Sequence, residues 1–331
     1  MPHPSIPTLK PPSVTKRAPW QDTHEVRINN WMTEWDFDSP LDVGFIGAPY
    51  SNASLTPSGA AGGPEAVRLA FRFNVTFSPD WETDIQRMTA RDLGDIAGDM
   101  TNVAQAHQNI EDAVRGALTL GHPFVPVIVG GDHSISAPAI RGFAKANPRK
   151  KIGVIKFDGH MDVRNFDYGN HNGTPFRQIL EREPHIDPAN FVEVGIHGFM
   201  NSSTYYQELL DQGTRVITGR DVQKRGMEDC AAEALELAAN GTDLIYVSVD
   251  IDCLAYPYTI GTSAASPEGL SAWQLLEAMW LCGQHPKVAA LDVVEIDPSR
   301  DVKDLTARSG CSTILTFLSG LYRRLYGDRG Y

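Results

Sequence analysis

The sequence predicts an α/β protein built on a parallel sheet, and three observations lead to that prediction. Short apolar segments that end in Gly or Asp recur along the chain. Between several of them lie segments with apolar residues at helical spacing. The apolar segments, such as VPVIVGG and LIYVSVD, are rich in β-branched residues, which is typical of strands covered by helices on both faces. This alternation favours parallel strands joined by crossover helices.

Eight segments are predicted as strands: 41–49, 89–97, 125–132, 151–158, 191–199, 214–219, 244–252 and 288–297. Four segments are predicted as helices: 64–73, 103–120, 230–240 and 271–281. No linker, repeat or low-complexity segment follows residue 40, so we expect an N-terminal extended arm over 1–40 and a single domain over 41–331. The arm carries Trp20, Trp31 and Trp35, which could pack on a neighbouring subunit or on their own domain.

The composition excludes several classes of protein. The chain has 331 residues, with 29 Lys and Arg against 41 Asp and Glu and a formal net charge of −12, which argues against a nucleic-acid partner. Its four cysteines form no CxxC pair, so we expect reduced thiols. No segment approaches the roughly 20 apolar residues of a membrane span, and the N-terminus lacks a signal-peptide pattern. We therefore expect a cytoplasmic protein without a membrane partner.

Carboxylate and imidazole groups follow several predicted strands. Asp158, His160 and Asp162 are spaced i, i+2, i+4, which in extended backbone places them on one face. Each motif alone is also typical of a capped turn or a solvated loop, but together they would gather at one edge of a parallel sheet. Such a cluster needs a compensating positive charge, which two divalent cations supply. The expected ligands are His133, Asp158, His160, Asp162, Asp250 and Asp252. Histidine and carboxylate without thiolate favour Mn²⁺, with Zn²⁺, Ni²⁺ or Fe²⁺ as less specific alternatives.

At this point the sequence resembles the arginase/agmatinase ureohydrolases. GGDHS at 130–134, DGHMD at 158–162 and SVDID at 248–252 match the family's three signatures in order, and EIDP at 295–298 is similar to its late acidic motif. The resemblance implies a three-layer α/β/α fold with an eight-stranded parallel sheet, assembled as a homo-oligomer, a trimer or hexamer. It also implies a ligand distribution: His133, Asp158, Asp162 and Asp250 on one metal, His160 and Asp252 completing the other, and Asp158 and Asp250 bridging.

The expected chemistry is hydrolysis of a C–N bond in a linear amidine or guanidine. Metal-activated water would attack the planar carbon, Asp162 could accept a proton from it, and Glu295 is suited to pairing with the cationic substrate. His171 has two interpretations, an acid/base residue or a loop histidine without a catalytic role. His197 likewise either lines the pocket or is a satisfied residue at a strand end.

The segments expected to contact the substrate indicate which subgroup of the family the sequence resembles. Asn172 precedes GTPF, where most urea-releasing members with this loop have His. Together with DVRN at 162–165 and GFMNSSTYY at 198–206, this pattern is similar to formimidoylglutamases, which hydrolyse N-formimidoyl-L-glutamate to L-glutamate and formamide. Because that substrate carries two carboxylates, the candidate substrate contacts are Arg164, Asn165 and Asn172. Arg177 and Arg308 are weaker candidates that salt bridges explain equally well.

Three departures from the family pattern keep other hypotheses open. Gly159 replaces the usual Ala of DAHxD, and Ala255 stands where an Asp is usual. The segment YTIGTSAASPEG at 258–269 also departs from the usual APGT-like turn, which often borders the pocket, so the substrate could differ from formimidoylglutamate. One alternative is a urea-releasing hydrolase of a guanidino acid, agmatine or guanidine. A second is a non-catalytic partner subunit, which Ala255 supports and the complete ligand set opposes.

Overall fold

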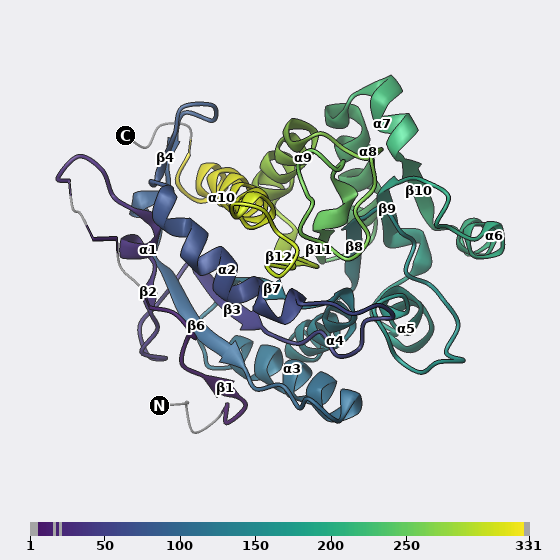
Figure 1. Cartoon of the computed structure of the whole chain (residues 1–331), viewed down its shortest axis with the longest axis horizontal. Helices are drawn as coiled ribbons and strands as arrows, with labels where there is room; N and C mark the ends of the chain where they lie inside the picture. Colours follow the sequence, from purple (N-terminus) through teal and green to yellow (C-terminus); the bar gives the residue numbers. More distant parts are fainter. Residues whose placement is uncertain (1–5, 16–17, 20–21, 328–331) are drawn as a thin grey trace.

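A central sheet lies between two layers of helices in the computed structural model of the chain, which describes residues 6–15, 18–19 and 22–327 (Figure 1). Eight strands form parallel pairs in the order β6-β3-β7-β12-β11-β8-β9-β10. They are β3 (Val43–Ala48), β6 (Ala90–Ile96), β7 (Val125–Gly130), β8 (Ile152–Phe157), β9 (Phe191–Ile196), β10 (Arg215–Thr218), β11 (Leu244–Asp250) and β12 (Val288–Val294). Each falls within one of the eight predicted segments, so the predicted three-layer α/β/α fold is confirmed.

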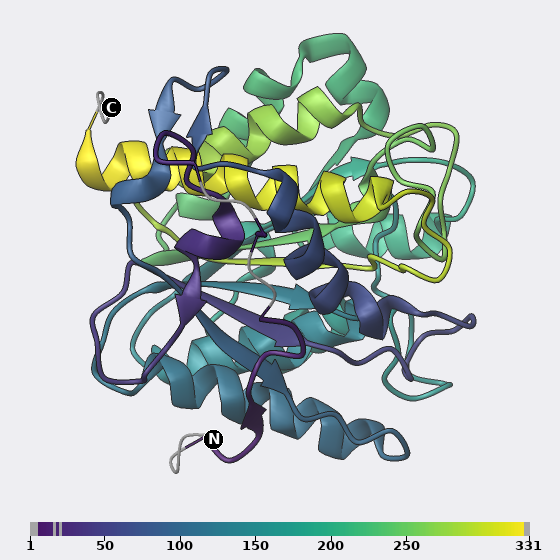
Figure 2. The same cartoon turned by 60° about the vertical axis from the view of Figure 1, so that its left-hand side comes forward.

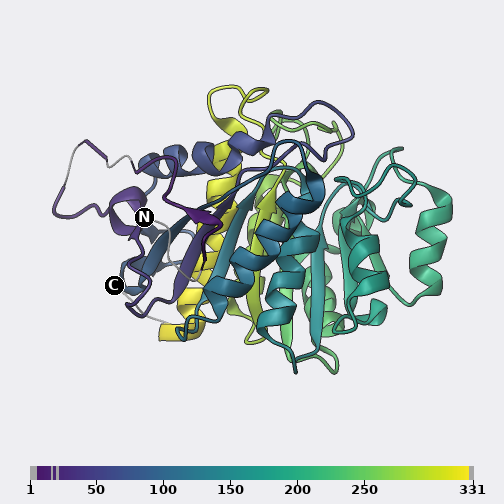
Figure 3. The ribbon, with the colours of Figure 1, turned by 90° about the horizontal axis from the view of Figure 1, so that it is seen from below.

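The N-terminal segment adds two short strands to the same sheet. β1 (Leu9–Lys10) pairs antiparallel with β6, and β2 (Thr33–Glu34) pairs parallel with it, giving ten strands. The one-turn helix α1 (Ile28–Trp31) lies between them. Trp31 and Trp35 pack on their own chain, since Trp31 Nε1 donates to the carbonyl of Met88 at 3.0 Å and Trp35 is buried. Trp20 lies outside the described residues. Figure 3 shows this purple segment and the teal strand β10 at opposite ends of the sheet.

Helices cover both faces of the sheet (Figure 2). On one face lie α3 (Val103–Leu118), α4 (Ser136–Ala146) and α5 (Pro175–Arg182); on the other lie α2 (Gly63–Ala70), α8 (Met227–Ala239), α9 (Ala272–Gln284) and α10 (Leu305–Tyr326). Two further helices, α6 (Ser203–Asp211) and α7 (Gly219–Arg225), flank β10. The four predicted helices correspond to α2, α3, α8 and α9. No helix of the described residues has the length and apolar character needed to cross a membrane.

Burial on both faces explains the continuous apolar strands. All six residues of β8 are buried, with Val154 facing α4 and α5 and Ile155 facing the opposite helical layer. Burying one such side chain contributes about 1.5–3 kcal/mol. Lys156 is the exception in this strand, because it is charged and fully buried. All four cysteines are buried free thiols.

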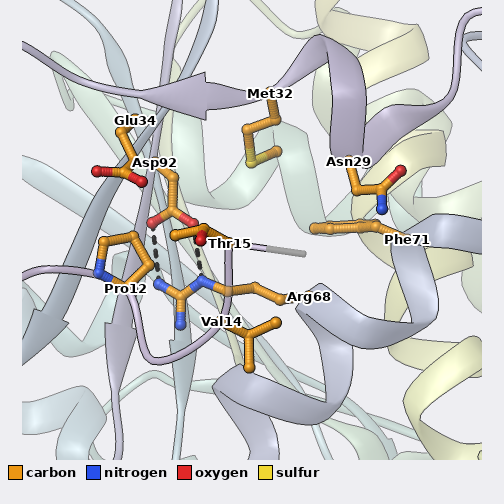
Figure 4. A pocket seen from close by; sticks show the side chains of 9 residues that line it. All are labelled: Pro12, Val14, Thr15, Asn29, Met32, Glu34, Arg68, Phe71 and Asp92. Carbon is orange, nitrogen blue, oxygen red and sulfur yellow. Dashed lines mark hydrogen bonds and ion pairs between the residues drawn. The ribbon is translucent and has the colours of Figure 1, made fainter. Parts of the chain in front are cut away.

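A small pocket at the N-terminal edge holds a buried ion cluster (Figure 4). Arg68 of α2 pairs with both carboxylate oxygens of Asp92 at 2.7 and 2.9 Å and with Asp95 at 2.6 Å. The second oxygen of Asp95 accepts the backbone N–H of Ser13 at 2.8 Å. Arg68 therefore binds both aspartates of β6, and Asp95 holds the N-terminal segment against that strand.

Candidate metal centre

Two overlapping groups of metal-ligand side chains meet at the carboxyl ends of β7, β8 and β11. Within the described part of the chain they are His133, Asp158, Asp162 and Asp250, and Asp158, His160 and Asp252. In each group, one candidate ligand atom per residue lies within 4.8 Å of the others. The structure thus brings together all six residues that the sequence analysis selected. Asp158 belongs to both groups, whereas Asp250 belongs to the first.

Tight turns, rather than extended backbone, place these residues. β8 ends at Phe157, and the Oδ1 of Asp158 accepts the backbone N–H of His160 at 2.6 Å. Asp250 accepts the N–H of Asp252 in the same way at 2.8 Å. The expectation that 158–162 continues as extended chain is therefore wrong. Each strand-end aspartate caps the turn that carries the next ligand, which accounts for the two-residue spacing.

The GGDHS segment combines both interpretations of its sequence. Asp132 caps the turn after β7, where its Oδ1 accepts the N–H of Ser134 at 3.0 Å, while His133 beside it faces the carboxylates. A Cβ on Gly131 would lie 1.7 Å from the carbonyl oxygen of Tyr50, so this close approach requires glycine. The turn is fixed by packing as well as by its cap.

Two functional candidates have left-handed backbone. Asp162 has a φ of 50° and Glu295 a φ of 63°, a region that costs non-glycine residues energy. The turn at Asp162 brings its Oδ2 to 2.9 Å from His133 Nδ1. The two residues with strained backbone are therefore residues whose side chains contact His133.

The surroundings of His133 fit a cation. Its buried Nδ1 makes no well-formed hydrogen bond, although carboxylate oxygens of Asp162, Asp158 and Asp250 lie 2.9, 3.2 and 3.2 Å away. One imidazole nitrogen cannot serve three acceptors with a single proton. Four donors directed at one point form the oxygen and nitrogen set that Mn²⁺ accepts. The buried Oδ2 of Asp158 likewise makes no well-formed hydrogen bond, which supports the same conclusion.

A chain of buried hydrogen bonds sets the tautomer of His133. Its Nε2 lies 3.1 Å from Ser248 Oγ, and this hydroxyl donates to Asp292 Oδ1 at 2.6 Å. Tyr246 Oη donates to the other oxygen of Asp292 at 2.9 Å. Because Ser248 donates its own proton to Asp292, Nε2–H donates to Ser248, so in the neutral imidazole that a cation would bind the lone pair of Nδ1 faces the carboxylates. Sequence reasoning missed Asp292 and Tyr246; a lone charge inside the apolar strand 288–294 was the available signal.

When no metal is bound, the protonated imidazoles of His133 and His160 supply the positive charge beside the aspartates. Although burial opposes protonation, Asp252 and Asp158 raise the pKa of His160 to about 12. Burial likewise opposes protonation of His133, but Asp158, Asp162 and Asp250 raise its pKa well above the usual range. Cation binding must therefore displace protons from both imidazoles.

Glu295 lies against the first group of ligands. Its Oε1 accepts the backbone N–H of His133 at 3.0 Å and the side-chain amide of Asn172 at 3.1 Å. Burial, with the nearby charge of Asp132, raises the pKa of Glu295 to about 8. The structure thus places Glu295 and Asn172 together beside the centre.

The remaining candidate residues lie in the loop 163–174, and the structure places them in different surroundings. Arg164 is exposed and lines a cleft that also contains His160 and Asp162. Asn165 does not line this cleft; its side-chain amide donates to Asp167 within the loop at 2.8 Å. His171 is buried, and its Nδ1 accepts the N–H of Gly173 at 3.0 Å. Burial, together with Arg164, lowers the pKa of His171, so this imidazole is neutral near pH 7.

The second wall of the cleft comes from the segment 198–206, which carries part of the resemblance, although sequence reasoning did not select Asn201. Asn201, which follows β9, accepts the N–H of Met161 at 3.0 Å and donates to the carbonyls of Gly159 and His197 at 2.9 and 3.0 Å. Its three bonds hold the ligand turn of 158–162 to the loop after β9. His197 lies beside Gly159, with Nδ1 bonded to the carbonyl of Gly195 at 2.7 Å.

The two weaker candidates have structural partners. Arg177 pairs with Glu208 at 2.6 Å and with Glu181 at 3.0 Å. The guanidinium of Arg308 lies 4.0 Å from the centre of the Phe73 ring.

Fold and site together define an α/β metal-dependent hydrolase with a histidine and carboxylate centre. The chain belongs to the arginase family, whose model matches residues 41–320. It is 36% identical to formimidoylglutamase from Halalkalibacterium halodurans over 92% of this chain and 94% of that protein. Its structure is similar to that of Bacillus subtilis formimidoylglutamase (TM-score 0.86, 32% identity, 91% of this chain and 94% of that one). It is also similar to Trypanosoma cruzi formiminoglutamase with Mn²⁺ (TM-score 0.82, 26% identity, 92% and 100%).

Proposed function

We propose that this protein hydrolyses N-formimidoyl-L-glutamate to L-glutamate and formamide, using two Mn²⁺ ions held by the six residues described above. The observation that carries the proposal is a complete six-residue donor set in a chain that matches a formimidoylglutamase over nine-tenths of its length. The bound cations would supply positive charge that lowers the pKa of a water molecule. Proton transfer and substrate binding are assigned to side chains of the protein.

Asp162 is the proposed proton carrier. Its Oδ2 faces the first metal group, and the residue also lines the cleft, so it is within reach of both water and substrate. We assign to this oxygen the proton released by the attacking water and its delivery to the departing nitrogen of glutamate.

Glu295 and Arg164 are the proposed binding groups for the two ends of the substrate. Although burial raises the pKa of Glu295 to about 8, the amidinium cation would favour its ionised form, and Asn172 fixes one oxygen of the resulting carboxylate. Arg164 offers a guanidinium to a substrate carboxylate from the cleft wall. Asn165 orders the loop through Asp167, and His171 holds the turn before Thr174, so both support the position of Arg164 and Asn172.

A product-resolved assay tests the proposal. Purified protein reconstituted with Mn²⁺, and separately with Ni²⁺, is incubated with formimidoylglutamate, guanidino acids, agmatine and arginine, and formamide and urea are quantified. Formamide from formimidoylglutamate as the preferred reaction supports the proposal. Urea from a guanidino compound establishes the alternative activity. If protein with two bound ions yields neither product, only the hypothesis of a non-catalytic partner subunit remains.

We further propose a cytoplasmic homo-oligomer, a trimer or hexamer. The support is the resemblance to a family of oligomeric enzymes, and light scattering coupled to size exclusion measures the state directly. A monomer at micromolar concentration contradicts this part of the proposal without affecting the catalytic one.

A further inference from the structure

A buried ion pair lies directly beneath the metal centre. Lys156 of β8 and Glu193 of β9 are register partners in the parallel sheet, both fully buried, with Nζ and Oε2 3.0 Å apart. The same row continues through Ser248 and Asp292 on β11 and β12, which orient His133. Apolar residues at positions 156 and 193 would fill this layer without the cost of removing two charges from water.

Lys156 reaches the ligand shared by both metal groups. Its Nζ lies 3.2 Å from Asp158 Oδ2, the oxygen that also faces His133. The ammonium donates to the carbonyl of His160 at 2.6 Å and lies 4.6 Å from the centre of the Phe176 ring. These contacts hold a permanent positive charge where Asp158 would meet a divalent cation.

An uncompensated ammonium at this position would repel both metal ions in a dry interior. Glu193 is the counter-charge beside Lys156 on the side away from the centre. Burial, with Asp158 and Asp162 adding repulsion, raises the pKa of Glu193, whereas Lys156 opposes that rise. Divalent cations on the two aspartates remove the repulsion, so a loaded centre favours the ionised form of Glu193.

We propose that Glu193 is a positioning residue that acts through Lys156: it holds the ammonium and cancels its charge, so that Asp158 can serve both cations. The inference rests on the metal centre of the proposed function and not on the identity of the substrate. Lys156 then fixes the direction of Asp158 without lowering the metal affinity of the site.

The test is Mn²⁺ binding to metal-stripped protein, followed by the EPR signal of free Mn²⁺, with no substrate present. E193Q leaves Lys156 uncompensated, and we expect its Kd for Mn²⁺ to rise at least about tenfold. K156M/E193Q removes both charges, and its Kd should return to within about threefold of the wild type. An unchanged Kd in E193Q, or a double variant as weak as E193Q, overturns the inference.

D92N is the matched control. It removes a carboxylate from the buried Arg68 cluster on β6, five strand positions from β8 and hence roughly 24 Å away. It should lower the melting temperature yet change the Kd for Mn²⁺ less than about twofold; a loss equal to that of E193Q overturns the inference. If E193Q does not fold, E193D replaces it. Because the shorter side chain pairs less well with Lys156, we expect the Kd of E193D for Mn²⁺ to rise at least about threefold. A wild-type Kd in E193D would overturn the inference. Wild-type protein that binds no Mn²⁺ instead refutes the proposed function.

Discussion

Asn172 Nδ2 donates a hydrogen bond of 3.1 Å to Glu295 Oε1, the same oxygen that accepts the backbone N–H of His133. The side chain of Asn172 is itself held, because its Oδ1 accepts the N–H of Leu55 at 3.1 Å. One carboxylate oxygen therefore connects the 171–174 loop to the turn that carries a metal ligand. The residue that departs from the family's usual histidine is a fixed part of the centre.

We expect N172A to lower kcat/KM by about tenfold to a hundredfold, since a hydrogen bond to a charged group contributes about 1.5–3 kcal/mol. The metal content should stay at the wild-type value, because Asn172 belongs to neither ligand group. Steady-state kinetics and metal analysis measure both quantities. N147A is the control, because the side-chain amide of Asn147 donates to the carbonyl of Phe143 at the end of α4, and its kcat/KM should remain within about threefold of wild type. Equal losses in N172A and N147A would contradict the assignment.

The strands and the ligand set could be predicted because their signals are local. A strand buried on both faces is a continuous apolar run, and a strand-end Asp two residues before the next ligand is visible in a single segment. The backbone between those ligands could not be predicted, because i, i+2 spacing fits both extended chain and the capped turn that forms. Left-handed φ at Asp162 and Glu295 leaves no mark in the sequence.

The outer partners of the site depend on contacts between distant segments. Asn201 reaches Gly159 across 42 residues, and Asp292 reaches His133 only through Ser248. Gly159 shows the same limit: the sequence shows only that it replaces the usual Ala, whereas the structure shows that His197 fills the space of its missing side chain. Ala255 donates its backbone N–H to the carbonyl of Leu270 at 2.9 Å.

G159A should be destabilising in this chain. A Cβ at position 159 would lie 2.9 Å from Cε1 of His197, which is too close, and 3.2 Å from its Nε2, so the imidazole would have to shift. We expect a loss of about 1–3 kcal/mol in the free energy of unfolding. In an H197A background the same change should cost less than about 0.5 kcal/mol. Urea denaturation of the four proteins measures this coupling, and an equal cost in both backgrounds rules out the steric explanation.

D158N should remove both metal ions, because Asp158 belongs to both ligand groups, and D250N should remove at least the ion of the first group. Activity should be abolished in both variants while the far-UV circular dichroism spectrum stays that of the wild type. Metal content per chain after gel filtration is the measurement. D243N, which neutralises an exposed aspartate paired with Lys150, is the control and should keep two ions. Two retained ions in D158N would refute the shared-ligand assignment.

Acid sensitivity should depend in part on His107 of α3. This buried imidazole lies 3.1 Å from Ser134 Oγ, and burial, with Arg141 adding, lowers its pKa to about 4. The unfolded chain takes up the same proton near pH 6.5. Between these values the unfolded state binds more protons, so the free energy of unfolding is highest above about pH 6.5 and falls toward pH 4.

H107Q keeps a hydrogen-bonding group beside Ser134 but does not titrate. Between pH 7 and pH 4, the wild type should therefore lose up to ~3 kcal/mol more unfolding free energy than H107Q does. Urea denaturation at several pH values, with chelator present so that metal release does not contribute, gives both curves. Parallel curves would mean that His107 takes up its proton at the same pH in the folded and the unfolded protein, which contradicts the lowered pKa of the buried imidazole.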